Sequence, residues 1–225
     1  MDIVIAGGHG KIAMLLHPIL SERGHSVRGL IRNPDQDQDL RDAGAEPVIF
    51  DLEKDEDIVE AIEGADAVVF AAGAGPGSGA QRKWSVDRDG AIKLMTGCKK
   101  AGIDRYVMLS AMGVDGDIDT DNEVFAAYME AKSQADEVLR KIGLAYTIIR
   151  PGSLTDDEPT GRITLGERIE SAEIPRADVA AVLAYVLEHP ETVGLQLEVT
   201  SGDKPIDDAF QEQFRRGQSA ASPRL

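Results

Sequence analysis

The chain has 225 residues, with 24 lysines and arginines against 40 aspartates and glutamates, so its formal net charge is −16 at pH 7. This balance argues against a general nucleic-acid or acidic-membrane partner, because phosphate contacts need a basic face. It leaves room for one small phosphorylated ligand in a local basic pocket.

The single cysteine, Cys98, excludes a disulfide within the chain. No apolar run reaches the roughly 18 residues of a membrane span. No basic segment precedes a long apolar stretch at the start of the sequence, so we expect a cytoplasmic protein without a signal peptide.

Strand and helix patterns alternate from the start of the sequence. Short apolar runs predict buried strands at 3–6, 27–31, 47–50, 67–71, 106–109 and 145–149. Helical patterns lie between and after them, at 11–22, 37–43, 55–63, 84–101 and 123–142. A helix at 177–187 and a last strand at 195–199 follow. The alternation predicts an α/β fold, a doubly wound parallel sheet with helices on both faces.

We predict a single domain over residues 1–215, followed by a flexible tail at 216–225 that is poor in bulky apolar residues. A small C-terminal extension, about 151–215, is expected on the substrate side of this domain. Parallel sheets bind ligands beyond the carboxyl ends of their strands. The loops after the six predicted strands are therefore where we expect functional residues.

A glycine-rich turn follows the first predicted strand and opens the first predicted helix. Residues 6–13 read AGGHGKIA and satisfy the pattern G-x-G-x-x-A from Gly8 to Ala13. Glycines permit a tight turn and let backbone amides approach a pyrophosphate, whose charge the helix N-terminus favours. In this strand–turn–helix context the motif predicts dinucleotide binding rather than a plain turn.

The end of the second predicted strand indicates which dinucleotide is bound. An NAD site usually carries an acid there to hold the ribose 2′-hydroxyl. Residues 30–33 read LIRN, with Arg32 and no acid. A guanidinium can grip a 2′-phosphate with two hydrogen bonds, and Lys11 and His9 would add positive charge nearby. We therefore predict NADP(H), with NAD as the alternative.

Several motifs, taken in order, resemble the atypical short-chain dehydrogenases/reductases, specifically their NmrA-like and biliverdin-reductase-B-like members, which are often labelled NAD-dependent epimerase/dehydratase. The similarity covers about residues 1–200. It is carried by the glycine turn, 32–34 (RNP), 51–52 (DL), 71–73 (AAG), Ser110, 128–132 (YMEAK) and 150–154 (RPGSL). The resemblance implies a Rossmann-type NAD(P)-binding domain. It also implies cofactor contacts at Gly7, His9, Gly10, Lys11, Ile12, Arg32, Asp51, Leu52, Ala71, Ala72, Gly73, Lys132, Pro151, Gly152 and Leu154.

The same resemblance implies a catalytic group of Ser110, Tyr128 and Lys132. Tyr128 and Lys132 are four residues apart on one predicted helix and share a face. A phenol titrates near 10 when unperturbed, and we expect the neighbouring ammonium to lower the pKa of Tyr128. Tyr128 would then act as general acid while a carbonyl accepts hydride. Ser110, after the fifth strand, would donate a hydrogen bond to the substrate oxygen.

Two features depart from the family pattern. Asp87 stands where the family often has an asparagine, and an ionised carboxylate cannot donate a hydrogen bond. With Trp84, Asp87 is a candidate residue on the substrate side. Only about 70 residues follow the sixth strand, too few for the substrate domain of a sugar-nucleotide enzyme.

These observations predict an NADP(H)-dependent reductase of a small carbonyl, quinone or conjugated substrate. An NADP(H)-binding redox sensor or assembly factor without turnover is the main alternative, and an epimerase/dehydratase is a third. No metal site is predicted, because the histidines lack ligand spacing and residues 115–121 lack the glycine and glutamate of a calcium loop. A small-molecule substrate is the expected partner, and the resemblance allows a homodimer.

Overall fold

The computed structural model describes residues 1–75, 77–116 and 120–221, so part of the acidic loop at 115–121 and the end of the predicted tail lie outside the described residues. Its strands are β1 (Asp2–Ala6), β2 (Ser26–Ile31), β3 (Glu46–Ile49), β4 (Ala67–Phe70), β5 (Arg105–Leu109), β6 (Ala145–Pro151), β7 (Ser153–Thr155), β8 (Arg162–Gly166), β9 (Glu173–Pro175), β10 (Gln196–Ser201) and β11 (Lys204–Pro205). Its helices are α1 (Lys11–Glu22), η1 (Pro34–Gln36), α2 (Asp37–Asp42), α3 (Val59–Ile62), α4 (Ala80–Arg82), η2 (Lys83–Gly90), α5 (Ala91–Ala101), α6 (Glu123–Lys141), α7 (Arg176–Glu188), η3 (Pro190–Thr192) and α8 (Ile206–Ala221). Within the described ranges, no helix is long and apolar enough to cross a membrane.

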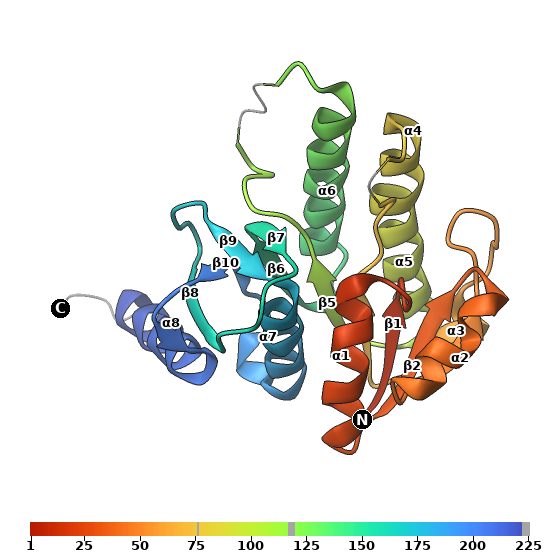
Figure 1. Cartoon of the computed structure of the whole chain (residues 1–225), viewed down its shortest axis with the longest axis horizontal. Coiled ribbons are helices and arrows are strands. Elements are labelled where there is room, and N and C mark those ends of the chain that lie inside the picture. Colours follow the sequence, from red (N-terminus) through yellow and green to blue (C-terminus); the bar gives the residue numbers. More distant parts are fainter. Residues whose placement is uncertain (76, 117–119, 222–225) are drawn as a thin grey trace.

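One large sheet forms the centre of the molecule, in the order β11-β8-β10-β6-β5-β4-β1-β2-β3 (Figure 1). The strands from β3 to β10 in this order are parallel. At the other edge β8 and β11 run antiparallel. The strand order reverses between β1 and β4, where a doubly wound sheet opens its ligand crevice. The predicted α/β doubly wound architecture is therefore confirmed.

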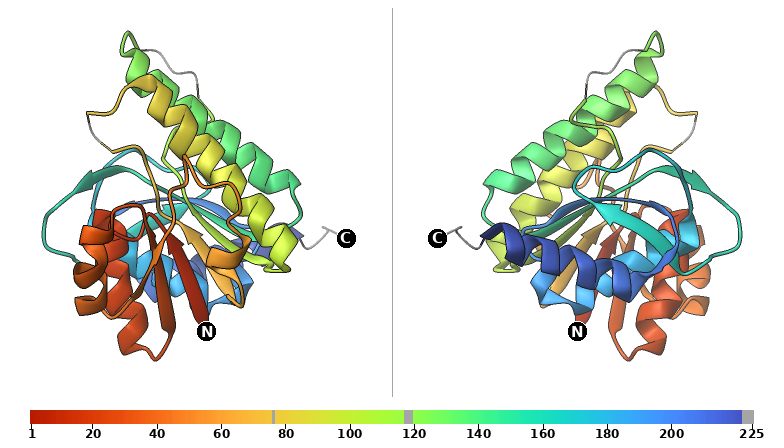
Figure 2. Two further views of the ribbon diagram at one scale, coloured as in Figure 1. Left: turned by 90° about the vertical axis from the view of Figure 1, so that its right-hand side faces the viewer. Right: turned by 90° about the vertical axis from the view of Figure 1, so that its left-hand side faces the viewer.

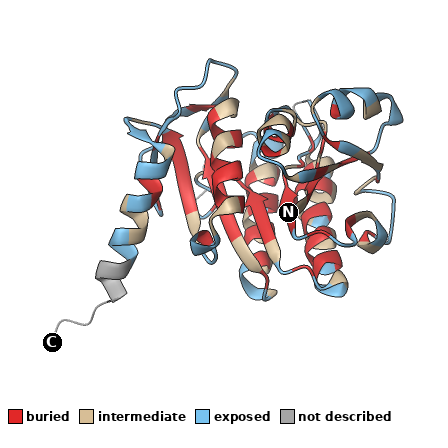
Figure 3. Ribbon diagram, turned by 90° about the horizontal axis from the view of Figure 1, so that it is seen from below, coloured by how far each residue is buried: buried red, intermediate tan, exposed pale blue. Residues whose placement is uncertain are grey.

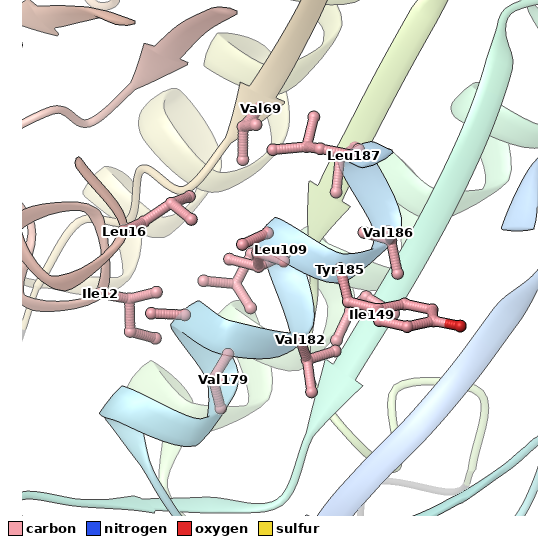
Figure 4. Packing of buried hydrophobic residues seen from close by; sticks show 14 of the residues in the cluster. Ile12, Leu16, Val69, Leu109, Ile149, Val179, Val182, Tyr185, Val186 and Leu187 are labelled. Carbon is pink, nitrogen blue, oxygen red and sulfur yellow. The ribbon is translucent and has the colours of Figure 1, made fainter. Parts of the chain in front are cut away.

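Helices cover both faces of this sheet. α1 and α7 lie on one face, and α5 and α6 lie side by side on the other (Figure 2). The strands between them are buried, and the exposed residues lie on the outer helix surfaces and loops (Figure 3). On the α1 and α7 face, Ile12, Leu16, Val179 and Val182 pack with strand residues such as Ile149 (Figure 4). Because β1 and β4 are buried on both faces, their near-continuous apolar sequences are the expected pattern.

Two predicted helices have different limits in the structure. The helix predicted at 55–63 is the short α3, because the Asp57 side chain accepts a hydrogen bond from the backbone of Val59 and the helix begins there. The helix predicted at 84–101 begins earlier, at Ala80, and its first part includes the π-helix η2. A π-helix is rare and frequently marks a functional site. In η2 it buries the side chains of Lys83 and Asp87.

The C-terminal part differs most from the sequence prediction. The strand at 195–199 is present as β10 but is not the last one, and β7, β8, β9 and β11 were not predicted. Helix α8 was missed, and residues 216–221 of the predicted flexible tail belong to it. Phe210 is fully buried and stacks on Tyr185, with ring centroids 4.3 Å apart. This aromatic contact packs α8 on α7, and the sequence prediction missed the repeat of Ile206, Phe210 and Phe214 that places apolar side chains on one face of α8.

The packing of α1 gives a direct test of the core. Leu16 is fully buried, whereas its neighbour Leu15 is 39% exposed. We expect Leu16→Ala to lower the free energy of unfolding by about 2–5 kcal/mol because it leaves a cavity. Leu15→Ala on the same helix is the control and should change it by less than about 0.5 kcal/mol. Chemical denaturation measures both, and equal losses would contradict this packing.

Candidate functional site

The glycine turn after β1 packs closely against strand β2 and against the loop that follows β4. Gly7 has φ +80°, and a Cβ there would lie 2.5 Å from the Cα of Ala72. A Cβ on Gly8 would lie 2.8 Å from the Cα of Gly29 in β2. The Gly8 amide donates to the carbonyl of Leu30 at 2.9 Å. Only glycine fits these two positions, because a Cβ would collide with the neighbouring backbone.

Helix α1 begins directly after this turn with its N-terminus suited to an anion. Gly10 caps it without a side-chain hydrogen bond, and its first turn contains no acid. The positive end of the helix dipole and its amide groups are therefore not neutralised by the helix's own side chains, which is the arrangement that binds pyrophosphate. The buried His17 forms a hydrogen bond with the carbonyl of Gly8, with its Nε2 2.7 Å from that oxygen. These residues fit the phosphates of a dinucleotide.

A pocket of about 200 Å³ opens beside the turn, at the carboxyl ends of β1, β2, β3 and β4. Most of the residues predicted to contact the adenosine half of the cofactor line this pocket. The predicted residues that line it are Gly7, His9, Gly10, Arg32, Asp51, Leu52, Ala71, Ala72 and Gly73. Leu30 and Phe50 add apolar surface to it. The pocket lies at the switch point of the sheet, where doubly wound folds bind their ligands.

The positive groups expected around this pocket are all paired within the chain. His9 Nε2 lies 2.8 Å from Asp39, and Lys11 Nζ lies 2.6 Å from Asp156. Arg32 NH1 lies 3.6 Å from a carboxylate oxygen of Glu53. The Lys11–Asp156 pair is largely exposed and His9 and Glu53 are partly exposed, so none of these pairs is enclosed in the core and each contributes little to stability.

The second half of the site lies at the carboxyl ends of β4 and β5. Lys132 on α6 is buried, and its Nζ donates to the carbonyl of Leu109 at 3.0 Å. The same Nζ lies 3.6 Å from Asp87 of η2. The other oxygen of Asp87 accepts a hydrogen bond from the backbone of Ala74, next to the adenosine pocket. The motif at 128–132 on α6 is thus linked to the π-helix η2 by the buried ion pair of Lys132 and Asp87.

Tyr128 lies one turn before Lys132 on α6 and is partly buried beneath η2. The ammonium of Lys83 lies 5.5 Å from the centre of its ring. Burial raises the pKa of Tyr128, and this effect outweighs the lowering by Lys132. The prediction of a lowered pKa was therefore wrong, because desolvation of the phenolate exceeds the attraction of the ammonium. Tyr128 remains a protonated phenol at neutral pH, the form that a general acid requires.

Ser110 is tied into a buried charged network. Its hydroxyl donates to Asp136 at 2.8 Å, and Asp136 also accepts two hydrogen bonds from Arg150. Arg150 in turn binds Asp115, and this contact holds the pKa of Asp115 below its ordinary value. Asp136 itself has a raised pKa because burial outweighs its contacts with Arg150. The Ser110 hydrogen is thus directed at Asp136 in this structure.

Several predicted site residues lie outside the adenosine pocket. Ile12 is buried in the core. The backbone amide of Gly152 donates a hydrogen bond to the carbonyl of Val199 in β10. Leu154 is an exposed residue of β7, two residues after Gly152. Trp84 of η2 is partly buried and stacks on the Arg88 guanidinium, 4.8 Å from its ring centre.

The sequence analysis missed two charged residues of the pocket wall, Glu53 and Arg82. Glu53 lies in the loop after β3, and Arg82 ends α4. Arg82 donates to Glu53 at 2.8 Å across 29 residues of sequence. No local pattern signals this contact, because it depends on how two separate loops meet over the sheet.

Fold and site together define an NAD(P)-binding oxidoreductase of the atypical short-chain dehydrogenase/reductase type. The family model described as NAD(P)H-binding matches residues 7–190, and the chain belongs to this family. The resemblance inferred from the motifs is thereby confirmed.

Related proteins match nearly the whole chain. It is 36% identical over 214 residues to the sugar epimerase YhfK of Bacillus subtilis (strain 168), itself uncharacterized, covering 94% of this chain and 100% of that protein. Among solved structures, a Bacillus halodurans protein named as an NAD-dependent epimerase/dehydratase has 36% identity and a TM-score of 0.87, with 94% of this chain and 99% of that chain covered. The oxidoreductase ylbE from Lactococcus lactis has 28% identity and a TM-score of 0.84, with 96% and 97% covered.

The glycine turn provides a test of nucleotide binding. Gly7→Ala should weaken NADPH and NADH binding at least about 10-fold, because the new Cβ meets the Ala72 backbone where the pyrophosphate is expected. Gly24→Ala is a matched control, since Gly24 also has positive φ but nothing lies within 4 Å of its Cβ position. Calorimetric titration measures affinity, and thermal unfolding checks that both variants fold. Unchanged affinity in folded Gly7→Ala would contradict the assigned turn.

The raised pKa of Tyr128 gives a second test. Its phenol should titrate above the ordinary tyrosine value of about 10, since burial disfavours the phenolate. An ultraviolet difference titration of wild type minus Tyr128→Phe isolates this phenol. A midpoint between pH 7 and 9 would show that Lys132 dominates instead.

Proposed function

We propose that this protein is an NADP(H)-dependent reductase that transfers hydride to a small carbonyl, quinone or other conjugated compound, with Tyr128 as general acid. The observation that carries this proposal is the cluster of Tyr128, Lys132 and Asp87 next to the nucleotide pocket. Lys132 and Asp87 are buried and lie 3.6 Å apart, and Asp87 is bonded to the backbone of Ala74 in the pocket wall. Lys132 is therefore linked through Asp87 to the wall of the pocket, and Tyr128 lies one helical turn before Lys132.

The chemistry divides between the cofactor and the chain. Bound nicotinamide supplies the hydride. Tyr128 would donate its phenolic proton to the substrate oxygen as the carbonyl carbon gains hydride, so that the product is an alcohol. Lys132 would stabilise the phenolate that this leaves and hold the nicotinamide ribose. The phenol holds its proton at neutral pH. Because burial raises the pKa of Tyr128 and makes it a weaker acid, the transfer relies on Lys132 to stabilise the phenolate.

The role of Ser110 depends on its bond to Asp136. For Ser110 to donate to a substrate oxygen, its hydroxyl must leave Asp136, to which it donates at 2.8 Å. With that bond kept, Ser110 can only accept a hydrogen bond, from the Tyr128 phenol or from an alcohol product. We favour the accepting role, because the bond to a carboxylate is charge-assisted and buried.

The preference for NADP(H) over NAD(H) is part of the proposal. Arg32 stands at the carboxyl end of β2, lines the pocket and is 57% exposed, so its guanidinium can turn to a 2′-phosphate. The epimerase names of some relatives suggest another use of the same cofactor. A reductase fits better, because a carbonyl acceptor needs no second domain to bind a nucleotide sugar.

Removal of the phenol should separate chemistry from binding. We expect Tyr128→Phe to lower kcat/KM for NADPH-dependent reduction of a quinone or aldehyde by about 100-fold or more, the usual contribution of a general acid. NADPH affinity should change less than about 2-fold. Tyr146→Phe, on a partly buried tyrosine of β6, is the control and should retain activity.

Two results would contradict the reductase. If Tyr128→Phe retains full turnover, Tyr128 is not the acid. If wild type binds NADPH tightly but reduces none of a panel of quinones, aldehydes and flavins, the protein fits an NADP(H)-binding sensor or assembly factor instead.

A further inference from the structure

Two arginines from separate segments converge on one carboxylate in the wall of the adenosine pocket. Arg82 NH2 lies 2.8 Å and its Nε 3.2 Å from Oε2 of Glu53. Arg32 NH1 lies 3.6 Å from the same oxygen. All three residues line the pocket. Oε2 of Glu53 therefore marks the point at which two guanidinium groups meet.

Glu53 remains ionised in this position. Burial raises its pKa, but hydrogen bonds from Ser85 and Arg82 outweigh burial, so that its pKa lies below the ordinary value. The Ser85 hydroxyl donates to Oε1 at 2.7 Å. Two guanidinium groups that hold one carboxylate form the same arrangement that would hold a phosphate oxygen. The side chain of Glu53 thus takes the place that an anionic ligand would take.

Building on the proposed NADP(H)-dependent function, we propose that Arg82 is the second arginine of the 2′-phosphate site and that Glu53 is a built-in competitor for that site. On binding, the phosphate takes the position of the Glu53 carboxylate between Arg32 and Arg82. Glu53 turns aside and keeps its hydrogen bond from Ser85.

The charges of the competing groups explain why a phosphate can displace the carboxylate. A phosphate monoester carries about −1.5 to −2 at neutral pH and has three strong acceptor oxygens, against one charge and two oxygens for Glu53. It can therefore bind both planar guanidinium groups at once. The 2′-hydroxyl of NAD(H) is neutral and offers the arginines nothing that would displace Glu53. The arginine pair favours NADP(H), and Glu53 reduces the size of that preference.

The exposure of the three side chains allows this exchange. Arg32 is 57%, Arg82 36% and Glu53 23% exposed, so none is locked in the core. Water screens partly exposed ion pairs of this kind, so a bound phosphate can replace the carboxylate. The site thus needs no rearrangement of the fold.

The test is calorimetric titration of the full chain with NADPH, NADH, 2′,5′-ADP and 5′-AMP, the last two differing only in the 2′-phosphate. The variants are Arg82→Gln and Glu53→Gln. Arg88→Gln is the matched control, because Arg88 lies on the next turns of the same helical segment and stacks on Trp84. Thermal unfolding confirms that each variant folds.

We expect Arg82→Gln to weaken NADPH and 2′,5′-ADP by about 10- to 100-fold, as the loss of a charged hydrogen-bond partner implies. NADH and 5′-AMP should change less than about 2-fold, and Glu53→Gln should tighten NADPH and 2′,5′-ADP by about 2- to 5-fold. Arg88→Gln should leave all four unchanged.

Other outcomes overturn the inference in distinguishable ways. Parallel weakening of NADPH and NADH in Arg82→Gln would make Arg82 a purely structural residue, and no tightening in Glu53→Gln would remove the competitor. Both results leave the reductase proposal intact. Wild type that binds NADPH no better than NADH overturns the inference and the NADP(H) preference alone. Wild type that binds neither nucleotide overturns the proposed function as well.

Discussion

The parallel pairing of β1 with β4 is the constraint on which the site depends. These strands are adjacent in the sheet, with Ala6 opposite Phe70, but the chain leaves them toward opposite faces, to α1 and to η2. The two loops diverge and open a crevice at their carboxyl ends. Gly7 approaches the backbone of Ala72 so closely that a Cβ would not fit, so the glycine turn is also a packing requirement.

The other half of the site is organised by buried charge. Lys132 reaches the carbonyl of Leu109 and approaches Asp87, while Arg150 satisfies Asp136. Removing one member of such a pair leaves an uncompensated buried charge, which is far more costly than losing a surface ion pair. These contacts fix η2 against α6 and the end of β5. They hold Tyr128 in place while its surroundings keep the phenol protonated.

Much of this architecture could be read from local patterns. The strands β1 to β6 are short apolar runs whose positions follow from hydrophobic periodicity, and the glycine turn follows from its context. The edge strand β11 has only two residues, both exposed, and is too short to carry a pattern. In contrast, β8 alternates exposed and buried residues, and α8 has Ile206, Phe210 and Phe214 on one face, so both had a pattern that the sequence prediction missed. The π-helix was not foreseeable, since its composition resembles that of an ordinary helix.

Periodicity and glycine spacing were sufficient to indicate a doubly wound sheet and a glycine turn at the start of α1, and Arg32 could be placed at the end of β2. Each of these features depends on residues close together in the chain. The position of Glu53 between Arg32 and Arg82, the bond from Ser110 to Asp136 and the raised pKa of Tyr128 were decided only by the tertiary structure. These features arise where segments distant in sequence meet. The strength of each charge interaction depends on the distance between the groups and on their desolvation. Both are set by how distant segments pack together, so no single stretch of sequence shows them.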